Sequence, residues 1–154
     1  MPASEQSKVN PPRGVFRKAP HPSEWSDQDF REAFESLRIV NEMFHHREHI
    51  RLAWIYSRRF SQEEALKRMA QGILAFARHH GAAAKYHHTI TMAWMRLVWQ
   101  AVRSGPPVAD FHTFAAAHPQ LLNPRLLADY YSEIWLQSDA ARHACMEPDL
   151  RSLP

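Results

Sequence analysis

The sequence predicts an all-α protein, a single-domain helical bundle of four longer helices plus two or three short ones. Three observations predict it: apolar residues recur three and four positions apart, no useful alternating strand pattern occurs, and only four glycines are present. With 45% hydrophobic residues, a chain of 154 residues can bury one core. We expect residues 23–154 to form this domain and the proline-rich residues 1–22 to form a flexible arm.

The first two expected helices are recognised by a cap and by their apolar spacing. Ser26 is a plausible N-cap, and apolar residues then recur at helical intervals. The second helix covers about 45–60 and has one apolar stripe. Arg47, Arg51 and Arg58 share its opposite face, which we expect to be in solvent.

The next two helices are longer. Ser61 and Glu64 match a capping box, which opens a third helix that stops near Gly81. The fourth helix, about 85–103, is apolar nearly all round. Because a helix without a polar face is surrounded by other elements, we expect this helix to be central.

The sequence after the fourth helix predicts shorter helical elements. "VADFHTFAAAHP" reads as one helix that stops before Pro119. In "NPRLLADYYS", Asn123 is the expected N-cap and Pro124 takes the first helical position. "SDAARHACMEPDL" predicts a last short turn.

Charge and cysteine content exclude few classes of function. The net charge of +3 is mild, and the basic residues are spread along the chain, so a nucleic-acid partner is not favoured. The single cysteine, Cys145, lacks the local signature of a cysteine enzyme and suits a reducing compartment. No apolar run is long enough for a membrane span and no secretory signal is recognisable, so we expect a cytoplasmic protein.

The histidine content is the most unusual feature of the composition, because the chain has eleven histidines. Two segments, "FHHREHIRLAW" and "YHHTITMAW", hold five of them. His46 and His49 are three residues apart and share a helix face, and His87 lies on the apolar line of the central helix. Since neutral imidazole is a common metal ligand and bundle cores host such sites, we predict that these three bind a divalent transition metal.

Other polar residues of the two segments have possible catalytic roles. His88 is a fourth ligand or a proton-transfer group, Arg47 could hold an anionic substrate, and Tyr86 places a hydroxyl nearby. Glu42 and Glu48 could supply a carboxylate ligand or a general base. The simpler interpretation is that the histidines are half-buried polar residues with ordinary hydrogen-bond partners.

The same segments resemble a family of small, uncharacterised bacterial helical proteins that carry H-R-x-H-[LI]-x-x-A followed by Y-H-[E/H]-T-[IL]-T. The resemblance covers roughly residues 25–154. His88 stands where the family tends to have Glu, which implies nitrogen-rich coordination and favours Zn, Fe, Cu or Ni. The matching residues are His46, Arg47, His49, Tyr86, His87, Thr89 and Thr91.

Two functional hypotheses follow. The first is a metal-dependent enzyme that acts on a small polar molecule, with the metal held by the second and fourth helices. The alternative is a non-enzymatic helical binding module whose arginine-rich helix face meets an acidic or nucleic-acid partner. That face comprises Arg47, Arg51, Arg58 and Arg59. The sequence does not specify the substrate, the metal or the oligomeric state.

Overall fold

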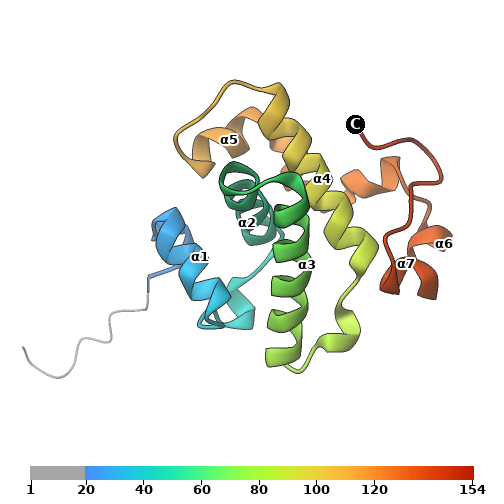
Figure 1. Cartoon of the computed structure of the whole chain (residues 1–154), viewed down its shortest axis with the longest axis horizontal. Coiled ribbons are helices and arrows are strands. Elements are labelled where there is room, and N and C mark those ends of the chain that lie inside the picture. Colours follow the sequence, from blue (N-terminus) through green and yellow to red (C-terminus); the bar gives the residue numbers. More distant parts are fainter. Residues whose placement is uncertain (1–19) are drawn as a thin grey trace, which may run out of the picture.

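A computed structural model describes residues 20–154, and all the regular structure in that part is helical (Figure 1). The predicted all-α bundle is confirmed. The α-helices are α1 (Asp27–Glu35), α2 (His46–Arg59), α3 (Gln62–His79), α4 (His88–Ser104), α5 (Phe111–Ala117), α6 (Glu133–Leu136) and α7 (Asp139–His143). Short 3-10 helices join them: η1 (Pro22–Glu24), η2 (Asn41–Met43), η3 (Ala83–Lys85), η4 (Pro119–Leu122) and η5 (Pro124–Asp129).

The second half of the chain is more broken than the sequence predicts. After α4, the described chain forms five short elements instead of two or three. The element that begins at Pro124 with Asn123 as its N-cap is confirmed, and the additional ones are η4, which begins at Pro119, and α6, which is capped by Ser132. Of the predicted arm, residues 1–22, positions 1–19 lie outside the described residues. Pro22, its last residue, is buried in η1. None of the helices in the described part is long and apolar enough to cross a membrane.

Helices α2, α3 and α4 form the centre of the molecule, with α1 on one side and α6 and α7 on the other (Figure 1). The expectation of a central fourth helix is confirmed, because α4 packs against α2, α3 and α7. Its buried residues point in several directions, as a helix without a polar face requires. They are Thr89, Met92, Ala93, Trp94, Met95, Leu97 and Val98.

Predicted caps set the starts of several helices. The side chains of Ser26 and Ser61 accept hydrogen bonds from the backbone N–H groups of Asp29 and Glu64. Each satisfies one of the four N–H groups that a helix start leaves unpaired. These local signals explain why the sequence places the beginnings of α1 and α3 correctly.

A stack of aromatic rings fastens α1 to α3. Phe34 lies 5.1 Å from Phe44 and 5.6 Å from Phe76 between ring centroids, and it is fully buried. Gly72 of α3 faces the same ring, and a Cβ added there would lie 2.8 Å from Cε1 of Phe34. The absence of a side chain at position 72 therefore allows α3 to approach α1.

We expect Gly72→Ala to destabilise the protein although alanine favours helix. Overpacking a closed core costs about 1–3 kcal/mol, and the gain in helix propensity returns at most about 1 kcal/mol. The midpoint of chemical denaturation should fall, and Phe34→Leu in the same chain should reduce the effect of the alanine. Gln71→Ala, an exposed neighbour, is the control; an unchanged midpoint for Gly72→Ala contradicts the close packing.

Candidate functional site

The predicted metal ligands of α2 are engaged in hydrogen bonds. Nε2 of His46 lies 2.8 Å from the carbonyl oxygen of Leu121, so the ring donates to η4, and it packs edge-on against Trp94. Nδ1 of His49 donates to the carbonyl of His45 at 2.8 Å. The ring of His49 also packs against Phe44. Both imidazoles therefore help to hold the start of α2 against its neighbours.

His87 differs from the prediction because it is the N-cap of α4 and not a residue within the helix. Its Nδ1 accepts a hydrogen bond from the backbone N–H of Ile90 at 3.2 Å. Nε2 therefore carries the proton and donates to the carbonyl oxygen of Leu136 at 2.6 Å. Both ring nitrogens of His87 are thus used, one to cap α4 and one to hold α6.

His88 and Tyr86 pair with each other. The hydroxyl of Tyr86 lies 2.8 Å from Nδ1 of His88. Burial lowers the pKa of His88 and raises the pKa of Tyr86, so each favours its neutral form. Neither residue lines either of the two hollows described below. Their predicted catalytic roles therefore stay predictions.

The threonines of "YHHTIT" connect α4 to the C-terminal part of the chain. Thr89 is fully buried and donates its hydroxyl to the carbonyl of Ala144 at 2.7 Å, and it accepts from the N–H of Met146 at 3.0 Å. Thr91 donates to the carbonyl of His87. Together with His87, this segment anchors residues 136–146, which are about fifty positions away in sequence.

The three predicted ligands do not fit a metal site in this arrangement. Within residues 20–154, no group of three or more His, Cys, Asp or Glu side chains is placed to hold a metal ion. A metal on His87 would have to displace one of its two hydrogen bonds. In contrast, His46 and His49 each use only one ring nitrogen in the hydrogen bonds just described, and the three rings are not grouped around one point. The metal-dependent enzyme therefore stays a prediction, and we derive no chemical step from it.

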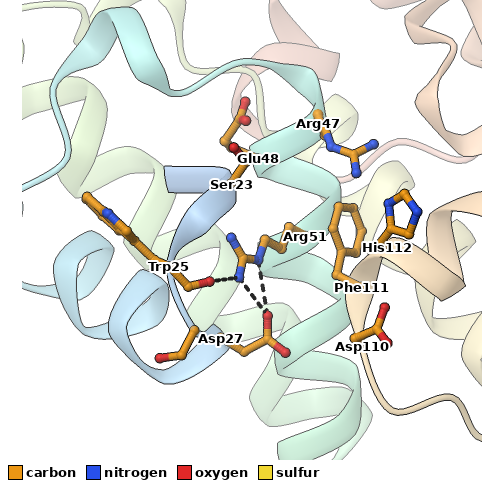
Figure 2. Close-up of a pocket in the computed structure, with 10 residues that line it drawn as sticks. Ser23, Trp25, Asp27, Arg47, Glu48, Arg51, Asp110, Phe111 and His112 are labelled. Atoms are coloured by element: carbon orange, nitrogen blue, oxygen red, sulfur yellow. Dashed lines mark hydrogen bonds and ion pairs between the residues drawn. The ribbon is translucent and has the colours of Figure 1, made fainter. Parts of the chain in front are cut away.

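A hollow of about 420 Å³ lies where the starts of α1, α2 and α5 meet, and we call it the Arg47 hollow. Its volume lies within the range of small-molecule sites. Figure 2 shows Arg47, Phe111 and His112 on one side of Arg51, and Trp25 on the other. The lining residues are Ser23, Trp25, Ser26, Asp27, Arg47, Glu48, Arg51, Asp110, Phe111 and His112.

Arg51 builds one wall of this hollow. Although we expected its side chain in solvent, the residue is only 8% exposed. Its guanidinium donates to the carbonyls of Pro22 and Trp25, each at 2.7 Å, and to Oδ1 of Asp27 at 2.9 and 3.1 Å (Figure 2). It also lies over the ring of Phe30. Arg51 therefore fastens the chain before α1 to α2 and is not available to a partner.

The acidic side chains of the hollow are all engaged. Asp27 pairs with Arg51, and Glu48, which is 6% exposed, accepts from the backbone N–H of His45 at 2.9 Å. Asp110 caps α5 by accepting from the N–H of Thr113, and this hydrogen bond lowers the pKa of its carboxyl. Each carboxylate stands at the start of a helix, where negative charge is favourable.

Arg47, unlike Asp27, has no charged partner among the described residues. Its guanidinium lies 5.1 Å from the ring centroid of Phe111, and the residue is exposed. The ion pairs formed among residues 20–154 involve the arginines 31, 51, 68 and 96, so Arg47 has no acidic partner in that part of the chain. Its predicted role in holding an anionic substrate stays a prediction.

Sequence reasoning identified only the α2 side of this hollow. Arg47 and Glu48 were candidates, whereas Trp25, Asp110 and Phe111 were not. These three come from segments that lie far from α2 in sequence and carry no local motif. Asp110 could have been recognised as an N-cap, but this signal predicts a helix start and not a binding site.

No protein-family model matches the chain, and neither a curated protein nor a solved structure shows significant similarity to it. The resemblance to the bacterial helical family therefore remains an expectation.

We expect His87→Ala to destabilise the protein by about 1–3 kcal/mol, because it removes an N-cap and a hydrogen bond to Leu136. The loss should be the same with and without a chelator, measured by chemical denaturation. A structural metal on His87 would instead make the wild-type protein itself less stable in the chelator. His112→Ala, at an exposed position, is the control.

Stability should fall as the pH decreases through the histidine range. Burial lowers the pKa of both His46 and His49, so the unfolded chain takes up these protons first. The stabilisation is complete above about pH 6.5, the ordinary histidine pKa, and is lost as the pH falls towards the lowered values. The melting temperature should decrease from pH 7.5 to 5.5, and less steeply in His49→Gln; equal slopes would contradict this assignment.

Proposed function

We propose that the protein is a binding module whose Arg47 hollow takes the carboxylate group of a ligand. The observation that supports this proposal is the charge inventory of the hollow. Its three acids each have a partner within the protein, whereas the guanidinium of Arg47 has none among residues 20–154. A ligand carboxylate can therefore form hydrogen bonds to Arg47 without displacing a protein group.

The chemistry around Arg47 favours a carboxylate over a phosphate. A single guanidinium matches one carboxylate in charge and in its two parallel donors. The carboxylates of Glu48 and Asp110 also line the hollow, and they would repel a doubly charged phosphate more strongly. The half-buried Trp25 adds apolar surface, which suits a ligand with a planar or apolar body.

This proposal is a revised form of the arginine-face hypothesis. Arg51 is removed from the set of binding residues because its donors are used inside the protein. Arg47 keeps the role in holding an anion that the sequence predicts. The metal-dependent enzyme hypothesis has no comparable support, since within residues 20–154 its expected ligands are not grouped to hold a metal ion and both ring nitrogens of His87 are hydrogen-bonded.

We expect benzoate to bind weakly at the Arg47 hollow and its neutral analogue benzamide not to bind. Backbone amide shifts in ¹H–¹⁵N spectra should move at residues 25, 47 and 111 on titration with benzoate. Arg47→Gln should weaken binding about tenfold, the usual effect of losing a charged hydrogen bond.

The matched control is Arg103→Gln, because Arg103 also lies over an aromatic ring, Trp99, but on α4. This variant should bind benzoate like the wild type. The proposal fails if benzoate shifts residues elsewhere, or if Arg47→Gln and wild type bind it equally.

A further inference from the structure

A second hollow, of about 290 Å³, lies farther along α2, and we call it the Arg58 hollow. Asp27 lines both hollows, so they adjoin at this residue beside α2, and we call the two together the groove. The Arg58 hollow is lined by Asp27, Gln28, Trp54, Ile55, Arg58 and Arg59.

Two arginines flank a pair of neighbouring aromatic rings along this groove. Arg47 lies over Phe111, the rings of Phe111 and Trp54 are 5.8 Å apart, and Arg58 lies 4.5 Å from the centroid of Trp54. Positions 47, 51, 54 and 58 are four, three and four apart, so they share one helix face. Two cations thus lie at the ends of a continuous aromatic strip.

The second hollow also offers cations without acidic partners. Arg58 and Arg59 form no ion pair with any of the residues 20–154, and Arg58 reaches only the carbonyl of Ala109, at 3.5 Å. The one carboxylate there, Asp27, is already paired with Arg51. A ligand that fills the whole groove should therefore carry negative charge at both ends.

The spacing of the cations sets the dimensions of that ligand. Arg47 and Arg58 are eleven residues apart on α2, which corresponds to about 16 Å at 1.5 Å per residue. An extended peptide advances about 3.3 Å per residue, so this distance spans about five residues. Acidic side chains four or six positions apart fit best, because they also point to the same side of an extended chain.

A peptide explains the groove better than a nucleic acid. Binding of single strands commonly uses bases stacked on exposed aromatic rings. Here Trp54 is 1% and Phe111 is 6% exposed, and arginines lie over both rings. Nearby Glu48 and Asp110 further disfavour a track of phosphates.

We infer that the groove between the Arg47 and Arg58 hollows binds an extended acidic polypeptide segment with two carboxylates four or six residues apart. This inference rests on the proposed function, because one of the two carboxylates occupies the Arg47 hollow. The other carboxylate pairs with Arg58 and Arg59.

The test is fluorescence anisotropy with a labelled nine-residue peptide of threonine and glycine that has glutamate at its third and seventh positions. The two-glutamate peptide should bind at least about fivefold more tightly than a peptide with only one glutamate. Arg59→Gln and Arg58→Gln should each weaken peptide binding about three- to tenfold. They should leave benzoate binding unchanged, whereas Arg103→Gln should change neither.

The outcomes separate the two proposals. If benzoate binds but the second glutamate adds nothing, the inference is overturned and the proposed function stands. If neither benzoate nor the peptide binds, both are overturned. Arg58→Lys keeps the charge over Trp54 and should retain most of the binding if Arg58→Gln fails to fold. If a twelve-residue oligothymidylate displaces the peptide at lower concentration than unlabelled peptide does, the groove is a nucleic-acid site and the inference is wrong.

Discussion

The need to cover the buried sides of α4 organises this protein. Buried residues such as Met92, Met95 and Val98 lie on several sides of this helix, and a polar edge remains only in its C-terminal half. Helices α2 and α3 cover two sides, and α7 covers part of the remainder. The short elements of the C-terminal chain are held by tertiary contacts, α7 to α4 and η4 to α2 and α5, rather than by their own helical stability.

Two histidines connect distant parts of this fold. His46 and His87 lie at the starts of two long helices, and each donates to a backbone carbonyl from a distant part of the chain. Burial of the His46 ring disfavours its charged form and lowers its pKa. The histidine-rich segments therefore have a structural explanation that links the fold to acid sensitivity.

The buried guanidinium of Arg51 shapes the Arg47 hollow. Arg51 draws Pro22, Trp25 and Asp27 onto α2, and its own charge is satisfied by that contact. The same contact forms a wall of the Arg47 hollow and separates it from the core. The internal Arg51 is thus part of the wall, while the exposed arginines at positions 47, 58 and 59 form no ion pair with the described residues.

The sequence by itself determined the helical class, the starts at Ser26 and Ser61 and the central place of α4, because caps and apolar spacing act over a few residues. It also indicated Arg47 as a residue that could hold an anionic substrate. Only the tertiary structure decided that Arg51 is internal, that His87 caps α4 and holds α6, and that Phe111 completes the groove. The contacts behind those roles join residues far apart in sequence, such as Arg51 with Pro22, His87 with Leu136 and Arg47 with Phe111, and no local pattern records which distant carbonyl or ring a side chain will meet.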